Sequence, residues 1–130
     1  MIQLYQHTYV GHENDPGVPI YTEATIEGKA RNSVSEVYDQ ITGDLDQAIQ
    51  LFESSEMPQR HISDATGNIA KGIRARVALV MNDWSTAATM AAGAREGYSL
   101  MTASDFSAVF DSYVEQNWMW GLEINAEQSI

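Results

Sequence analysis

The chain of 130 residues contains no cysteine, and basic residues are scarce in it. Without cysteine it can form no disulfide, no thiolate zinc site and no thiol nucleophile. Seven Lys and Arg stand against 18 Asp and Glu, so the net charge is −11. Nucleic-acid binding requires basic side chains that neutralise phosphates, and attachment to an anionic membrane face requires them too. The charge therefore excludes nucleic acid as a partner and argues against attachment to such a membrane face.

Long apolar runs and an export signal are missing as well. No stretch approaches the roughly 18–20 apolar residues that are needed to cross a membrane. The first seven residues lack the basic region, the apolar region and the cleavage site of a secretion signal. If the parent protein carries such a signal, we expect it to lie outside these 130 residues.

What is present is the composition of one globular domain, with 44% hydrophobic and 19% charged residues. The first 32 residues are rich in loop signals. They contain the turn sequence Asp15-Pro16-Gly17, and the residue before Pro19 favours extended backbone. Loops of this length in compact domains usually carry function or pack against the remaining structure.

The strongest helical pattern covers residues 33–54. Ser33 and Glu36 have the spacing of a capping box at its start. Apolar residues recur every three or four positions and predict a buried face made of Val34, Val37, Tyr38, Ile41, Leu45, Ala48, Ile49 and Phe52. Asp44 and Asp46 fall on the opposite face, which we expect to be in contact with solvent.

Two shorter helices are predicted over residues 67–81 and 84–95, with a turn at Asn82-Asp83 between them. The first helix has an apolar stripe formed by Ile69, Ile73, Val77 and Val80. Alanines dominate the second helix, and side chains this small let two helix axes approach closely. Beyond residue 97 we predict a short helix over residues 103–110 and a strand over residues 118–124, which is rich in Trp and other apolar residues.

Motifs of catalysis and cofactor binding are missing from the sequence. His7 and His12 lie five residues apart in a loop, unlike the His-Glu-x-x-His motif that places two imidazoles on one helix face. We interpret both as ordinary hydrogen-bonding side chains and expect no metal. Neither a glycine-rich phosphate loop nor a nucleophile-elbow serine occurs. We therefore expect no enzymatic activity and no cofactor.

Carbohydrate binding requires flat aromatic rings beside groups that hydrogen-bond to hydroxyls. Two segments have this mixture, the loop around residues 5–21 and the stretch at residues 113–118. The candidate ligand-binding residues are Tyr9, Asn14, Tyr21 and Trp118. Tyr38, Trp84 and Phe106 occupy helix or turn positions that are typical of core packing instead.

The segment over residues 68–95 resembles a tetratricopeptide hairpin. Trp84 follows the turn, Ala87 comes three positions later, and Ala75 takes the small-residue position of the first helix. Arg74 and Ala78 depart from the pattern, which has large apolar residues there. Because one hairpin cannot bury both of its faces, we expect exposed apolar surface and self-association.

A wider resemblance depends on blocks in a fixed order, which together span about residues 4–125. The blocks cover residues 4–5, 17–23, 31–41, 44–48, 71–79, 83–84, 97–101 and 117–124. In this order they resemble the central helical region of the SusD/RagB family, which comprises surface glycan-binding lipoproteins of Bacteroidetes. The resemblance implies a mainly α fold of tetratricopeptide-like antiparallel hairpins, with a long N-terminal loop and a short C-terminal strand.

The same resemblance implies how the chain is organised and what it does. Residues 1–130 would be a single partial domain, with a loop-rich segment at 1–32, a helical repeat region at 33–97, and a short helix and strand at 98–130. The whole protein would bind an oligosaccharide or another nutrient at the outer-membrane surface without cleaving it. It would work with a SusC-like TonB-dependent receptor, and its lipidated cysteine would lie outside these residues.

Two other hypotheses remain open. The first is a free-standing tetratricopeptide-like module that binds a partner protein in a helical groove. The second is an acidic hydrolase that uses His12 and Asp15, which turnover of a polysaccharide would reveal.

Overall fold

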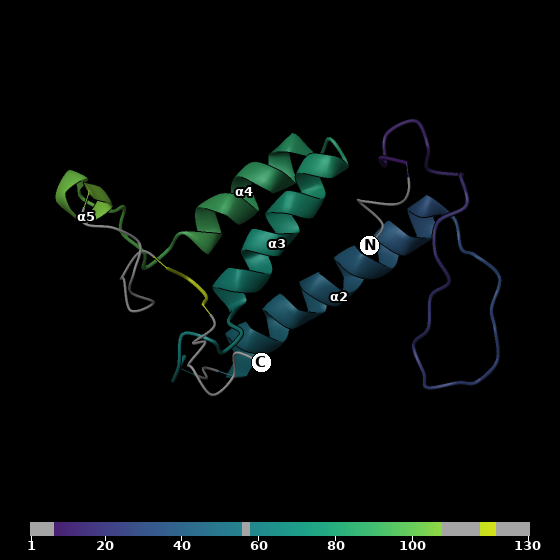
Figure 1. Cartoon of the computed structure of the whole chain (residues 1–130), viewed down its shortest axis with the longest axis horizontal. Coiled ribbons are helices and arrows are strands. Elements are labelled where there is room, and N and C mark those ends of the chain that lie inside the picture. Colours follow the sequence, from purple (N-terminus) through teal and green to yellow (C-terminus); the bar gives the residue numbers. More distant parts are fainter. Residues whose placement is uncertain (1–6, 56–57, 108–117, 122–130) are drawn as a thin grey trace.

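The structure is a computed structural model, and it describes residues 7–55, 58–107 and 118–121. In this part of the chain the helices are α2 (Val34–Ser55), α3 (Gly67–Val80), α4 (Trp84–Ala94) and α5 (Ala103–Ser107). The long helix α2 lies beside α3, α4 lies on the other side of α3, and α5 lies apart from all three (Figure 1). The predicted mainly α fold is confirmed for the described residues.

Side-chain caps explain where the three long helices begin. The backbone N–H of Ser33 donates to Glu36 Oε2 at 2.8 Å, and that of Glu36 donates to Ser33 Oγ at 3.1 Å, so the predicted capping box is confirmed. Thr66 caps α3, and Asp83 caps α4 by accepting from the Thr86 N–H at 3.1 Å. The predicted bounds of these helices agree with the structure to within one residue.

Helix α3 packs antiparallel to both of its neighbours. An ion pair of 2.9 Å joins Lys71 near its start to Glu53 near the end of α2. The Asn68 amide at its start donates to the carbonyl oxygen of Ala94, the last residue of α4, at 3.1 Å. Among the described helices α2 and α4 do not pack together, so α3 holds the bundle together.

Small residues form the contact between α3 and α4, as the sequence predicts. A Cβ added at Gly72 would lie 3.8 Å from the Cβ of Ala94. Ala75, Ala78 and Ala87 are buried, whereas Ile73 of the predicted apolar stripe is largely exposed. The predicted buried face of α3 is therefore partly wrong, because α4 covers its small-residue flank and α2 covers Val77, while Ile73 remains 47% exposed.

The core lies where α2 and α3 meet below the N-terminal loop. Val34, Val37, Tyr38 and Val77 form one buried cluster, and only 1% of Tyr38 is exposed. Asp46 does not simply face solvent as predicted, because its Oδ1 accepts from Arg74 Nε of α3 at 2.9 Å.

Two other predictions differ from the structure, the C-terminal strand and the core positions of Trp84 and Phe106. Residues 118–121 of the predicted strand form no strand, and residues 122–124 lie outside the described residues. This segment instead bonds to the loop before α3, since the Gly121 N–H donates to Ile62 O at 3.2 Å. Trp84 is 62% exposed and Phe106 65% exposed, so neither is a core residue. Helix α5 matches the first half of its predicted range, and residues 108–110 lie outside the described residues.

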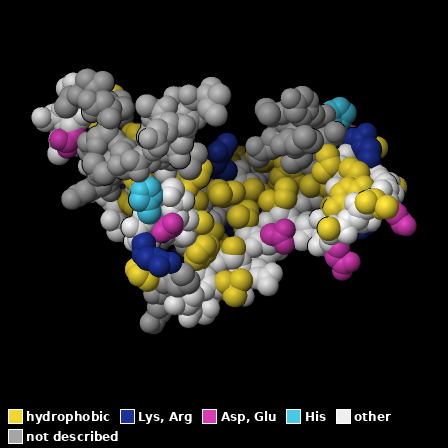
Figure 2. Space-filling view, turned by 60° about the horizontal axis from the view of Figure 1, so that its bottom comes forward, with side chains coloured by type: hydrophobic (Ala, Val, Ile, Leu, Met, Phe, Trp, Pro, Cys, Tyr) yellow, Lys and Arg dark blue, Asp and Glu magenta, His cyan; other side chains and the backbone are white. Residues whose placement is uncertain are grey.

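The predicted exposed apolar surface is confirmed. Hydrophobic side chains form a band across the face of the molecule in Figure 2. The exposed large apolar residues include Leu51 of α2, Leu79 of α3 and Trp84 of α4. None of the helices in the described ranges combines the length and the apolar character that a membrane crossing requires.

Candidate functional site

The N-terminal loop covers the start of α2 and carries three of the four candidate ligand residues. Its base is closed where Gly17 N–H donates to Asn32 O at 2.6 Å and Asn32 N–H donates to Val18 O at 3.3 Å. Arg31 strengthens this closure, because its Nε donates to Gly17 O at 2.6 Å and its Nη2 to Pro16 O at 2.7 Å. Residues 18–32 therefore form a loop whose two ends are fixed.

Tyr9 joins the loop to the core. Its ring meets that of Tyr38 edge-on, with centroids 5.0 Å apart, and it packs against the buried cluster. One side of Tyr9 is thus occupied by protein. Asn14 is exposed and lies in the turn of residues 12–15 beside it.

Tyr21 presents the most accessible aromatic ring of the candidate set in this loop. About half of the residue is exposed, and its hydroxyl oxygen accepts from the Lys29 N–H at 2.9 Å. The Lys29 ammonium lies 5.4 Å from the ring centroid. Residues 21 and 23–28 line a shallow hollow beside the ring. An exposed ring next to a cation is chemically suited to a polar ligand with an apolar face.

Trp118 lies in another part of the molecule. The segment that contains it packs on the loop between α2 and α3, where Gln59 Nε2 donates to Met119 O at 3.3 Å and Trp120 Nε1 to Ser63 O at 3.0 Å. That loop follows the end of α2, whereas Tyr9, Asn14 and Tyr21 lie at its start. A helix of 22 residues is about 33 Å long. Three candidate residues therefore lie in the N-terminal loop, and the fourth lies near the opposite end of α2.

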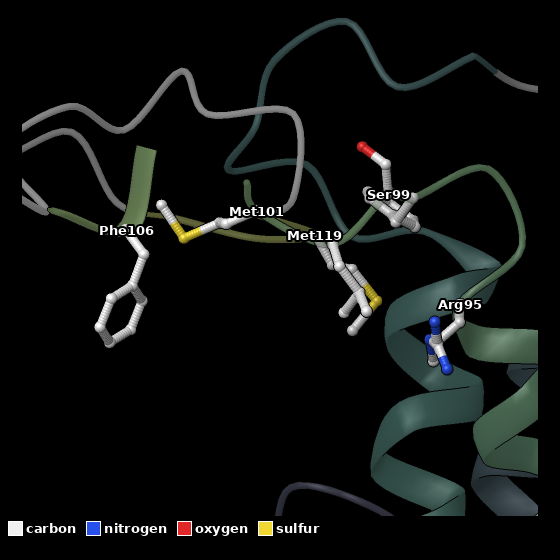
Figure 3. A pocket seen from close by; sticks show the side chains of 7 residues that line it. Arg95, Ser99, Met101, Phe106 and Met119 are labelled. Atoms are coloured by element: carbon white, nitrogen blue, oxygen red, sulfur yellow. The ribbon is translucent and has the colours of Figure 1, made fainter. Parts of the chain in front are cut away.

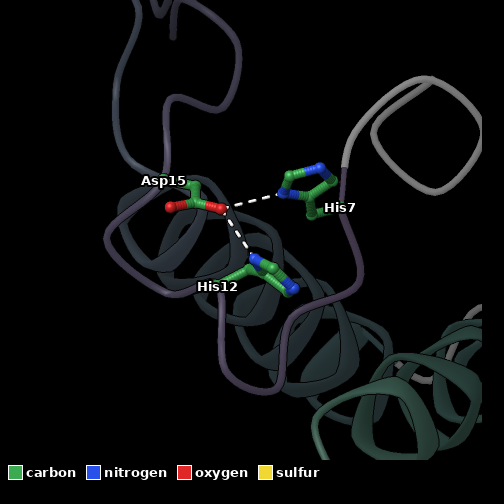
Figure 4. Close-up of side chains that lie close together, drawn as sticks. All are labelled: His7, His12 and Asp15. Atoms are coloured by element: carbon green, nitrogen blue, oxygen red, sulfur yellow. Dashed lines mark hydrogen bonds and ion pairs between the residues drawn. The ribbon is translucent and has the colours of Figure 1, made fainter.

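Two histidines and one aspartate form a cluster near the start of α2. His7 Nδ1 lies 2.8 Å from Asp15 Oδ2, and His12 Nδ1 lies 2.7 Å from the same oxygen (Figure 4). The two imidazole centroids are 4.3 Å apart. These hydrogen bonds, that of His7 first, hold the pKa of the Asp15 carboxyl below its ordinary value. One ligand atom from each of the three residues lies within 4.8 Å of the others.

Sequence reasoning placed His7, Asn14 and Asp15 in one polar loop but did not group the two histidines around one carboxylate. The grouping depends on two consecutive turns, in which His12 N–H donates to Tyr9 O and Asp15 N–H donates to His12 O. Gly11 permits the first turn with a φ of +83°. In the sequence, Gly11 was the residue that could have indicated a turn between the two histidines.

A second hollow lies beyond the end of α4. It has a volume of about 560 Å³ and is lined by Arg95, Tyr98, Ser99, Leu100, Met101, Phe106 and Met119. Arg95 and Phe106 lie at its opposite ends, with Met119 between them (Figure 3). Its wall is mainly apolar, with one guanidinium group. The sequence did not predict this site, because its residues come from three separate segments.

Together these features describe a small α-helical scaffold whose loops carry aromatic, polar and charged side chains. No protein-family model matches the chain, and no curated protein matches it. A solved structure does match, that of a SusD-like carbohydrate binding protein from Bacteroides vulgatus ATCC 8482. The sequences are 33% identical, the TM-score is 0.70, and the match covers 88% of this chain.

The chain spans 25% of the length of that SusD-like protein. The resemblance to the SusD/RagB family that the sequence predicts is therefore confirmed, and it concerns one quarter of a longer relative.

Proposed function

We propose that residues 1–130 are the helical scaffold of a SusD-like protein that binds an oligosaccharide or another nutrient without cleaving it. The observation that carries the proposal is the structural match to a SusD-like carbohydrate binding protein at 33% identity over 88% of this chain. At that identity, a similar fold supports a similar class of ligand. Exposed aromatic and polar side chains in the N-terminal loop are consistent with it.

The chain would form a single partial domain of a longer protein. Its loop-rich segment is 1–32, its helical repeat region of tetratricopeptide-like hairpins is 33–97, and residues 98–130 complete it. Exposed apolar residues such as Leu79 and Trp84 support this proposal, because soluble proteins rarely leave a large apolar face uncovered. Further helices of the parent protein would cover these residues.

The parent protein would be a lipoprotein at the surface of the outer membrane, and its partner a SusC-like TonB-dependent receptor that takes part in polysaccharide uptake. This part of the proposal follows from the family resemblance. Immunolabelling of intact cells and co-purification with a TonB-dependent receptor test it. A protein found only inside the cell would contradict it.

Among the candidate ligand residues, Tyr21 has the ring best placed to contact a sugar. Tyr9 is engaged with Tyr38, Asn14 offers only polar groups, and Trp118 lies apart. An exposed aromatic face covers the apolar side of a pyranose, while Lys29 beside the ring can bond to its hydroxyls.

Replacing Tyr21 by alanine and by phenylalanine tests this assignment. Tyr21→Ala removes the ring and should weaken binding of the cognate oligosaccharide by about three- to tenfold, the usual contribution of one aromatic contact. Tyr21→Phe keeps the ring and should retain most of the affinity. Isothermal titration of the whole protein with a panel of oligosaccharides measures both. Equal affinities in all three proteins would remove Tyr21 from the site.

The alternative function is a tetratricopeptide-like module that binds a partner protein. The mainly apolar hollow beside Arg95 favours it, because peptide side chains fill such hollows. Titration separates the two functions: peptide binding without any oligosaccharide binding would replace our proposal by the alternative. Turnover of a polysaccharide that disappears in His12→Ala or Asp15→Ala would replace both by a hydrolase.

A further inference from the structure

We propose that His7, His12 and Asp15 form a binding site for a divalent transition-metal ion of the Zn²⁺ type, which fixes the N-terminal loop at the start of α2. The site would be distinct from the sugar contact at Tyr21. Its evidence is the convergence of three ligand atoms from one loop, two of them from the turn of residues 12–15 and one from His7, which precedes it (Figure 4).

The donor set selects the ion. Two imidazole nitrogens and one carboxylate oxygen are typical ligands of Zn²⁺ and its neighbours in the first transition row. Calcium and magnesium prefer oxygen ligands alone. A net charge of −11 on the chain also favours binding of a cation over binding of an anion.

The distances are compatible with this ion. Tetrahedral zinc with bonds of about 2.0–2.1 Å holds neighbouring ligand atoms about 3.3 Å apart. The two Nδ1 atoms now lie 2.8 and 2.7 Å from Asp15 Oδ2, so an outward shift of roughly half an ångström at each histidine makes room for it. His7 is the most exposed of the three side chains and can shift most easily.

Two of the three ligands are already fixed by the fold. The Val34 N–H at the start of α2 donates to Asp15 O at 2.9 Å, which ties this residue to the helix. His12 is connected to Asp15 by the turn in which Asp15 N–H donates to His12 O at 3.0 Å. Such fixed ligands lose little conformational freedom when an ion binds.

A metal ion would also change how the two imidazoles share one oxygen of the Asp15 carboxylate. At present both imidazoles direct Nδ1 at one oxygen, so each must carry its proton there to donate a hydrogen bond. When an ion binds at the two Nδ1 atoms, each imidazole carries its proton on Nε2 instead, and the two Nδ1 lone pairs and the carboxylate are the ligands. Because all three side chains are partly exposed, the fourth coordination position faces solvent.

Titration of the whole protein with ZnCl₂ tests the proposal by isothermal calorimetry. We expect the wild-type protein to bind one equivalent of Zn²⁺ that His7→Ala, His12→Ala and Asp15→Asn each lose or bind at least tenfold more weakly. Asp15→Asn retains the shape of the side chain and one oxygen acceptor but loses its charge, and the turn itself depends on the backbone of this residue, so the variant tests ligation without removing the turn.

The matched control is His61→Ala. His61 lies in another loop, where its Nδ1 is 2.7 Å from Ser63 Oγ, and its replacement should leave the zinc equivalent unchanged. A second readout is thermal unfolding: Zn²⁺ should raise the melting temperature of the wild type and of His61→Ala but not of Asp15→Asn. Absence of zinc binding in the wild type, or equal binding in all the variants, would overturn the proposal.

Discussion

Gly17 lies where the two ends of the loop of residues 18–32 meet. A Cβ at this position would lie 3.0 Å from both Asn32 O and Ser33 O, which are backbone atoms that cannot turn aside. The short hydrogen bond from Gly17 N–H to Asn32 O requires this close approach. A residue with a side chain would therefore push the two segments apart.

We predict that Gly17→Ala destabilises the protein by about 1–3 kcal/mol, the usual cost of forcing extra atoms into a tight contact. Gly28→Ala in the same loop is the matched control, because a Cβ there meets nothing within 4 Å, and it should change stability little. Urea unfolding of the two variants measures the difference. Equal urea midpoints for the two variants would contradict this prediction, because they would mean that the base of the loop accommodates the extra methyl group without loss of stability.

Individual residues also mark where sequence reasoning succeeded and where it did not. Ser33 and Glu36 could be identified because a capping box depends only on spacing along the chain. The carboxyl of Glu36 keeps a pKa below its ordinary value, first because it accepts from the Ser33 backbone N–H and then from Asn32. The grouping of His7 and His12 around Asp15 depends on the backbone turns of residues 9–12 and 12–15. The spacing of these residues along the chain does not determine such turns.

At the scale of the elements, α3 is the helix on which the other two pack. Its contact with α4 includes several residues no larger than alanine, and Ala87 of α4 is buried while its neighbour Ala88 is exposed. The axes can approach closely only while these positions stay small.

We therefore expect Ala87→Leu to destabilise the protein by about 1–3 kcal/mol, because the larger side chain separates the two helices. Ala88→Leu adds the same atoms on the exposed side of the same helix and should change stability by less than about 0.5 kcal/mol. Thermal unfolding followed by circular dichroism compares the two variants. If Ala87→Leu and Ala88→Leu lower the free energy of unfolding equally, the contact at Ala87 does not limit how closely α3 and α4 approach.

The elements could be predicted well because their signals are local. Helix bounds follow from caps and periodicity, and these agree with the structure to within a residue for α2, α3 and α4. The buried face of α3 could be predicted only in part, since Val77 is buried as expected whereas Ile73 is 47% exposed. Trp118 was grouped with Tyr21 by residue type, yet its segment packs beyond the far end of α2.

The whole molecule exposes apolar side chains on all three long helices, among them Leu51, Leu79 and Trp84. Figure 2 shows hydrophobic side chains gathered in a band on one face of the molecule. A surface of this kind normally contacts another protein surface. In isolation the 130-residue chain should therefore contact copies of itself.

We predict that the isolated chain self-associates at high protein concentration, which sedimentation velocity would show as a mass that rises with concentration. The double variant Leu79→Glu and Trp84→Glu should be mainly monomeric, because it replaces two exposed apolar side chains by charged ones. Gln50→Glu on the exposed side of α2 adds a charge without removing apolar area and should associate like the wild type. A strictly monomeric wild-type chain would contradict the prediction.

The closed base of the loop of residues 18–32 lets the sequence of this loop vary without change to the helices. Residues 21–31 are all exposed, while the bonds of Gly17 and Arg31 fix the ends of the loop. Doubling the length of such a loop costs only about 0.6 kcal/mol in closure entropy. Insertions and substitutions between the two ends can therefore accumulate, and new specificities can arise there, while the helices below keep their structure.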